Sequence, residues 1–150
     1  KTDIQLHTEG GQITVSKVNT GVPHTGIIVQ DLEAFSHVTL QSLGKTVRTH
    51  KYFQPEGTNV NFIEAIPSGS LKVKTYERGV EDITFACGTG VVAAALIAHT
   101  KKLVESPVSI QTIGGKLTVY FEKGDTGYRN VFLEGDARAV YTGELTDEAV

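Results

Sequence analysis

The 150-residue chain has a single cysteine, Cys87, and no methionine. One cysteine cannot form an internal disulfide, which favours a reducing compartment, and we expect a cytoplasmic protein. Because the first residue is Lys1 and not methionine, we expect a domain or fragment of a longer protein. No apolar run approaches the roughly 20 residues that span a bilayer, and residues 1–4 do not form a signal peptide, so we expect no membrane partner.

Runs of like charge are also scarce. The formal net charge is -3, and the longest basic run is the pair Lys101 and Lys102, so we expect no nucleic-acid partner. The five histidines are scattered, without the CxxC, HExxH or HxH spacings that are typical of metal sites. The sequence therefore predicts no metal site.

The composition does provide enough apolar residues for a core. Hydrophobic residues make up 39% of the chain and charged residues 21%, which is typical of a globular domain. No internal repeat or linker divides the sequence, so we expect residues 1–150 to form a single domain.

Two apolar patterns predict helices. Residues 91–98 are apolar on every side, and a helix without a polar face belongs in a protein interior, so we predict a buried helix at about 88–102. Residues 38–50 carry spaced apolar side chains and predict a second, surface helix, which Gly44 weakens.

Alternating apolar and polar residues predict strands. The expected runs are 12–16, 25–29, 59–66, 70–76, 108–113, 116–121 and 131–136, with a strand-rich tail over 137–145. Gly114 and Gly115 form a hairpin signal between two of these runs. The fold class is therefore α+β, a mostly antiparallel, curved sheet wrapped around one buried helix, with the second helix outside.

Cys87 lies at the start of the predicted buried helix and precedes Gly88, Thr89 and Gly90. The N–H groups of a first helical turn lack intrahelical partners and lie at the positive end of the helix dipole. They can hold a carboxylate, and a thiol beside them can ionise near neutral pH. The two glycines cost about 1 kcal/mol each relative to alanine but let a ligand approach the backbone closely. The pattern favours a catalytic cysteine over a small buried side chain.

Two other functions are compatible with the same residues. Residues 88–93 match the G-x-G-x-x-A fingerprint of dinucleotide sites. That motif requires a hydrophobic strand directly before it and an acidic residue at the end of the next strand, and neither is present here. A hydrolase that pairs Cys87 with His24 would need the two side chains to be in contact.

Glu77 and Arg78 lie ten and nine residues before the cysteine. Adjacent opposite charges are often a solvated strand end. A carboxylate for an ammonium group and a guanidinium for a carboxylate are, however, what a zwitterionic ligand requires. The three side chains together favour chemistry on an amino or keto acid.

The string from Tyr76 to Gly79, followed by residues 86–90, resembles the C-terminal signature of diaminopimelate epimerase, a pyridoxal-phosphate-independent amino acid epimerase. The resemblance extends in collinear order through residues 20–24, 53–59 and 133–138 and through the Gly114–Gly115 hairpin. It implies a protein of two similar lobes, each a sheet around a central helix, with the site in the cleft between them. This chain resembles the C-terminal lobe, and the missing N-terminal lobe would be its partner. An exposed cleft face would also allow a homodimer.

The resemblance implies a reaction in which two thiols exchange protons with the substrate and no cofactor takes part. One thiolate removes the α-proton of LL-diaminopimelate and the opposing thiol protonates the other face, which gives the meso form, a precursor of lysine and of cell walls. Cys87 is similar to the second-lobe cysteine, and His24 and Glu77 would tune the thiols. One thiol cannot supply both groups, so we expect no epimerisation by this chain alone.

The resemblance also implies a set of substrate-binding residues. Gly88 and Thr89 would offer backbone N–H groups to the α-carboxylate. Glu77 would bind the α-ammonium group and Arg78 the distal carboxylate. Asn59 is similar to a substrate-binding asparagine of the family.

One residue departs from the family pattern. Many members carry asparagine directly before the Pro-His pair, and this chain has Val22, whose side chain forms no hydrogen bonds. A related racemase or isomerase with another substrate range therefore stays open, as does a non-catalytic binding lobe.

Overall fold

The structure is a computed structural model that describes residues 1–149. Its strands form one mixed sheet in the order β1-β2-β3-β4-β5-β7-β8-β9, and β6 pairs with β5. The strands are β1 (Ile4–Thr8), β2 (Gly11–Asn19), β3 (Pro23–Val29), β4 (Asn59–Ile66), β5 (Ser70–Tyr76), β6 (Ile83–Thr84), β7 (Val108–Thr112), β8 (Gly115–Gly124) and β9 (Gly127–Gly135). Two short 3₁₀ turns, η1 (Lys51–Phe53) and η2 (Asp147–Ala149), complete the described elements together with two α-helices.

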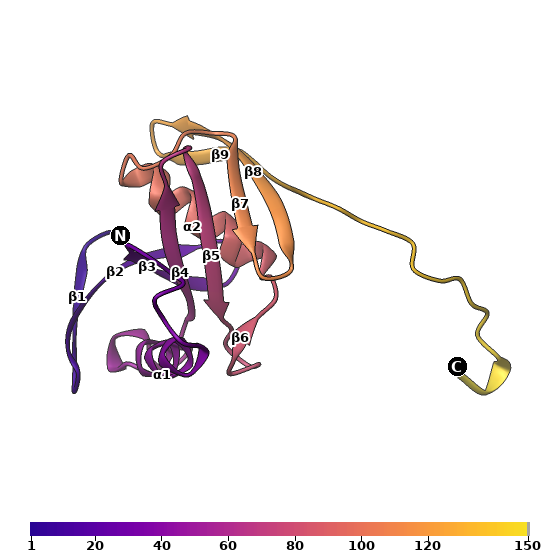
Figure 1. The fold of residues 1–150 in the computed structure, drawn as a ribbon, viewed down its shortest axis with the longest axis horizontal. Coiled ribbons are helices and arrows are strands. Elements are labelled where there is room, and N and C mark those ends of the chain that lie inside the picture. Colours follow the sequence, from indigo (N-terminus) through magenta and orange to yellow (C-terminus); the bar gives the residue numbers. More distant parts are fainter. Residues whose placement is uncertain (150) are drawn as a thin grey trace.

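The sheet is mostly antiparallel and has two parallel pairs, β3 with β4 and β5 with β7. Each parallel pair is joined by a helix, as parallel strands require. Helix α1 (His37–Arg48) connects β3 to β4, and helix α2 (Gly88–Thr100) follows β5 and β6 and leads to β7. Figure 1 shows the sheet curving around α2, with α1 outside it. The predicted fold class is confirmed.

Helix α2 is buried because it is apolar on every side. It contains eight buried residues, which are Gly90, Val91, Ala93, Ala94, Ala95, Leu96, Ile97 and Ala98. All of these except Gly90 and Ala93 belong to a core with Ile63 of β4, Leu71 of β5 and Val108 of β7. The helix ends at Thr100, two residues before the predicted end, and Lys102 has a positive φ of 59°. Its burial fixes the position of its first turn, where Cys87 lies.

Helix α1 covers the opposite face of the central strands. Ser36 caps it by accepting a hydrogen bond from the Thr39 N–H at 3.1 Å. Its buried face joins a second core that includes Phe62 and Tyr76. Strand β4 thus sends Phe62 to the α1 side and Ile63 to the α2 side, and it is buried on both faces.

Two predictions about the chain ends need correction. Strand β1 was not predicted, although Ile4 and Leu6 alternate with polar residues and both are buried. The tail over 137–145 was predicted to be rich in strands, and the structure assigns none there. Figure 1 shows this segment leading away from the sheet, and Val140 and Tyr141 are each 88% exposed. An apolar pattern forms a strand only beside a pairing partner, and no strand of the described residues lies next to this one. Across residues 1–149, the helices are too short or too polar to cross a membrane.

Candidate functional site

Cys87 is the N-cap residue of α2. Its backbone is extended, with φ -123° and ψ 106°, and its side chain is half-buried. The first helical hydrogen bond runs from the Val91 N–H to the Cys87 carbonyl at 2.8 Å. The N–H groups of Gly88 and Thr89 precede that bond and have no intrahelical carbonyl to donate to. The expected pairing of a thiol with free helix N–H groups is therefore present.

Gly90 lets strand β4 approach the sulfur. A Cβ atom at this position would lie 2.5 Å from Asn61 Oδ1 and 3.2 Å from Cys87 Sγ. The first distance is shorter than any real contact of a Cβ atom. The second glycine of the Gly-Thr-Gly turn is therefore required by packing, since any side chain would separate β4 from the thiol.

The hairpin glycine Gly114 supports the segment before the cysteine. Its N–H donates to the Phe85 carbonyl at 2.7 Å, and a Cβ atom there would lie 3.1 Å from the same oxygen. The glycine pair read as a hairpin signal does join β7 to β8. It also fixes the strand that leads into Cys87.

A row of hydrogen bonds connects the thiol to the interior of the sheet. Cys87 Sγ lies 3.6 Å from Thr89 Oγ1, which lies 3.0 Å from His24 Nε2. The other ring nitrogen, Nδ1, lies 3.2 Å from the Asn61 amide nitrogen. His24 and Asn61 are both fully buried. The Thr89 hydroxyl thus lies between Cys87 and His24, so these contacts do not form the direct pair of a cysteine hydrolase.

His24 is uncharged at neutral pH. Its burial, with a smaller contribution from the Arg78 charge, lowers its pKa to about 4. A histidine with this pKa is a weak base. It can act on the thiol through hydrogen bonds but not as a positive charge.

Glu77 and Arg78 begin the turn that follows β5. Glu81, with a φ of 62°, holds this turn because its carboxylate accepts hydrogen bonds from Tyr76 Oη, Arg48 Nε and the Gly79 N–H. The three bonds have lengths of 3.0, 2.7 and 3.0 Å. The three hydrogen bonds to Glu81 therefore fix the turn. Glu77 and Arg78 are both half-buried on it.

Asn59 links the turn to β3. Its amide donates to the Pro23 carbonyl at 3.3 Å, and its Oδ1 accepts from the Arg78 N–H at 2.8 Å. The Arg78 guanidinium donates to the Glu56 carbonyl at 2.8 Å. Asn59 therefore positions Arg78, and its amide carries a second hydrogen that a ligand could accept.

The thiol of Cys87 differs from the sequence expectation. Burial raises its pKa above the usual cysteine value, and the charge of Glu77 raises it further. The Thr89 hydroxyl and the Gly90 N–H favour the thiolate and offset part of this rise. The prediction that the helix N-terminus brings ionisation near neutral pH was wrong for this chain, because burial and a neighbouring carboxylate outweigh it. Cys87 is protonated at neutral pH and is suited to donate a proton.

Four residues with polar contacts to the site were not predicted as site residues. Thr20 Oγ1 donates to the Thr89 carbonyl at 3.2 Å, and Thr84 Oγ1 donates to Glu77 at 2.5 Å. Asn61 and Thr75 lie behind His24 and are hydrogen-bonded to each other at 3.0 Å. Only Asn61 had a usable signal, an amide flanked by apolar residues within a strand.

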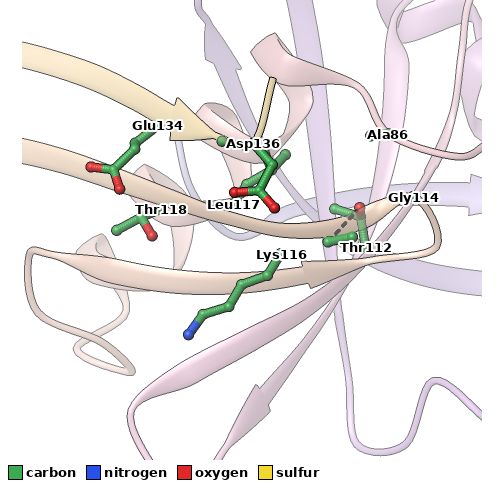
Figure 2. Close-up of a pocket in the computed structure, with 10 residues that line it drawn as sticks. Ala86, Thr112, Gly114, Lys116, Leu117, Thr118, Glu134 and Asp136 are labelled. Carbon is green, nitrogen blue, oxygen red and sulfur yellow. Dashed lines mark hydrogen bonds between the residues drawn. The ribbon is translucent and has the colours of Figure 1, made fainter. Parts of the chain in front are cut away.

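Two of the surface hollows lie near the first turn of α2. A groove of about 640 Å³ runs along the first half of α2 and is bordered by Thr20, Gly88, Thr89, Val92 and Leu133. A cavity of about 450 Å³ at the β7–β8 hairpin includes Ala86, Glu134 and Asp136 but neither Cys87 nor His24 (Figure 2). The groove is therefore the hollow that borders the candidate site. No group of three His, Cys, Asp or Glu residues suited to a metal occurs in residues 1–149.

The sequence matches one protein family over most of its length. A family model described as diaminopimelate epimerase covers residues 16–140. A diaminopimelate epimerase of Aquifex aeolicus is 41% identical over 147 residues, which are 97% of this chain and 50% of the relative. One from Archaeoglobus fulgidus is 38% identical over 148 residues, again 97% of this chain and 49% of the relative. The chain thus spans about half the length of the curated relatives it matches.

Solved structures agree in fold at lower identity. A hydroxyproline epimerase from Agrobacterium vitis, solved with trans-4-hydroxy-L-proline, has a TM-score of 0.66 at 21% identity and covers 82% of this chain and 41% of its own. A probable proline racemase from Agrobacterium radiobacter K84 has a TM-score of 0.62 at 16% identity, with coverages of 91% and 50%. These two likenesses concern the fold. The match of residues 16–140 confirms the resemblance drawn from the sequence, and the chain belongs to the diaminopimelate epimerase family.

Proposed function

We propose that this chain is the C-terminal lobe of a cofactor-independent epimerase that interconverts LL- and meso-diaminopimelate. The observation that carries the proposal is the position of Cys87, a half-buried thiol at a helix N-terminus with free N–H groups beside it. An amino acid α-proton is very weakly acidic, so its removal needs fixed dipoles where negative charge develops. The first turn of α2 supplies such dipoles next to a proton donor.

The charges around the thiol support an amino acid substrate. Gly88 and Thr89 would donate N–H groups to the α-carboxylate, and Glu77 would bind the α-ammonium group. Arg78, on the same fixed turn, would bind the distal carboxylate with its planar fork. His24 would tune the thiol through Thr89. These roles remain proposals for each residue.

A second thiol must come from outside these residues. Inversion requires a base on one face of the α-carbon and an acid on the other, and the chain has one cysteine. The half-length match to the relatives supports a second lobe that supplies the other thiol. Exposed apolar side chains in the groove beside α2, Val131 at 38% and Leu133 at 43%, would be covered by that lobe. A cytoplasmic location would keep both thiols reduced, and a homodimer remains a prediction.

The runner-up function is a racemase or isomerase of other substrate range. It is favoured by Val22, an apolar side chain before the Pro23-His24 pair. A binding lobe without catalysis is a further alternative, which predicts that loss of the thiol changes neither ligand binding nor physiology.

A comparison of substrates tests the proposed function. We expect the two-lobe protein that contains this chain to invert LL-diaminopimelate and to leave proline, glutamate and aspartate unchanged. Arg78→Lys should raise KM for diaminopimelate about tenfold, because a point charge replaces a bidentate fork. Assays of optical inversion on the four amino acids measure both effects. Inversion of proline at a rate equal to that of diaminopimelate would establish the runner-up function.

A further inference from the structure

Asn61 is a polar side chain in an apolar part of the interior. It lies on β4 between Val60 and Phe62, and it is fully buried. Its amide nitrogen lies 3.0 Å from the Thr25 carbonyl oxygen and 3.2 Å from His24 Nδ1. Burial of an amide costs free energy unless its polar atoms are hydrogen-bonded, and the contacts of Asn61 satisfy both of its polar atoms.

The contacts of Asn61 fix which way its amide points. A backbone carbonyl can only accept a hydrogen bond, so the atom that faces Thr25 must be the NH₂ group. The Oδ1 atom on the other side accepts from the Thr75 hydroxyl at 3.0 Å. The second hydrogen of the NH₂ group therefore points at His24 Nδ1, which must accept it.

This orientation determines the proton on His24. An uncharged imidazole carries one proton, and Nδ1 holds none if it accepts from Asn61. The proton is then on Nε2, which lies 3.0 Å from Thr89 Oγ1 and donates to it. The single hydrogen of the Thr89 hydroxyl is thereby left for Cys87 Sγ at 3.6 Å.

We propose that Asn61 is a positioning residue that holds His24 as the Nε2–H tautomer, so that the Thr89 hydroxyl donates to the sulfur of Cys87. The proposal rests on the proposed function, because it concerns the sulfur that would exchange a proton with the substrate. Every hydrogen bond from Thr75 to Cys87 points toward the sulfur, and such a row stabilises the thiolate that remains once Cys87 has given up its proton.

The first measurement is the tautomer itself. Long-range ¹H–¹⁵N NMR of the histidine rings in this chain distinguishes a protonated Nε2 from a protonated Nδ1. We expect His24 to be the Nε2–H tautomer at neutral and alkaline pH. An Nδ1–H tautomer in the unmodified chain would overturn the proposal without any variant.

Asn61→Asp tests the consequence for Cys87. A carboxylate accepts from Nδ1–H, so the proton should move to Nδ1, and the Thr89 hydroxyl should turn to donate to Nε2. The sulfur then loses its donor, and we expect about tenfold less thiolate at a given pH, measured by ultraviolet absorbance. Thr75→Val is the matched control, because it removes a buried hydrogen bond of Asn61 but leaves its NH₂ group facing His24.

A double-mutant cycle with Thr89→Val separates the hydroxyl from the charge of the new carboxylate. That charge acts on Cys87 in both backgrounds, whereas the hydroxyl is absent from one. In the Thr89→Val background, we expect the loss of thiolate caused by Asn61→Asp to be smaller by about tenfold than in the unmodified chain. Additive effects would contradict the proposal. If Asn61→Asp does not fold, Thr89→Val alone decides, since an unchanged thiol titration would show that the hydroxyl does not donate.

These measurements need no substrate. A chain that shows the expected tautomer but belongs to a protein without epimerase activity would refute the proposed function alone. An epimerase whose His24 carries its proton on Nδ1 would refute the role of Asn61 alone.

Discussion

Cys87 is surrounded by groups with opposite effects on its ionisation. Burial and the Glu77 carboxylate raise its pKa, and the Thr89 hydroxyl and Gly90 N–H oppose them. The protonated form dominates at neutral pH, so under the proposed function this thiol would be the proton donor of the pair in the absence of substrate. The thiol of the other lobe would then have to be ionised to begin inversion of a substrate.

The pH dependence of alkylation tests this state of the thiol. Only the thiolate reacts, and the folded-state pKa is raised, so the rate midpoint should lie above the value of about 8.5 for a free cysteine. Glu77→Gln should lower the midpoint, since it removes a negative charge beside the sulfur. Glu9→Gln, in the exposed turn after β1, is the control and should not change it. A midpoint below that of free cysteine would show that the helix N-terminus lowers the pKa of Cys87 more than burial and the Glu77 charge raise it.

The sequence suggested candidate site residues, but it did not indicate their protonation states. Cys87, Glu77 and Arg78 lie within eleven consecutive positions, so the sequence groups them in one short segment. The pKa of Cys87 depends on burial and on the approach of Glu77 in space. The link from Asn61 to His24 depends on the parallel register of β3 and β4, in which His24 pairs with Asn59 and Gly26 with Asn61. Local sequence patterns contain neither quantity.

At the scale of elements, α1 supports the site through its contact with β5. A Cβ atom on Gly44 would lie 2.6 Å from the Tyr76 Cβ and Cγ atoms, so the helix rests directly on that ring. Tyr76 precedes Glu77 in the chain, and its hydroxyl donates to Glu81 at 3.0 Å. The glycine that weakens α1 as an isolated helix is therefore required by its packing.

Gly44→Ala tests this packing. Alanine favours a helix over glycine by about 1 kcal/mol, whereas overpacking of a buried ring costs about 1–3 kcal/mol. We expect a net loss in the free energy of unfolding, measured by denaturant titration. Ser42→Ala on the exposed side of the same helix is the matched control and should be neutral or slightly stabilising. A stabilised Gly44→Ala variant would contradict the close contact with Tyr76.

Helices and strands were predicted correctly where the pattern of apolar residues indicated which of their faces are buried. Helix α2 was predictable because its body is apolar on every side, and β5 because its apolar and polar residues alternate regularly. The tail over 137–145 has a similar composition but no strand beside it in the described residues, so its pattern misled. Strand β1 was missed although Ile4 and Leu6 carried the same signal.

At the scale of the whole molecule, the chain matches about half the length of its relatives, and the proposed function makes it half of a catalytic arrangement. The groove of about 640 Å³ is bordered by Gly88 and Thr89, the two residues of α2 that follow the thiol of Cys87. The exposed apolar residues Val131 and Leu133 line this groove and would otherwise face water. The account therefore expects catalysis only when a second lobe closes over the groove and excludes water.

Deuterium incorporation is the most direct test of this expectation. Proton NMR of LL-diaminopimelate in D₂O would follow loss of the α-proton signal and appearance of the meso form together. Three samples are compared: this chain alone, the two-lobe protein, and the two-lobe protein with Cys87→Ser. We predict exchange with inversion in the unmodified two-lobe protein only. The serine variant should be slower by orders of magnitude, because a hydroxyl barely ionises at neutral pH. Inversion by the chain alone, or near-native activity of Cys87→Ser, would contradict the account.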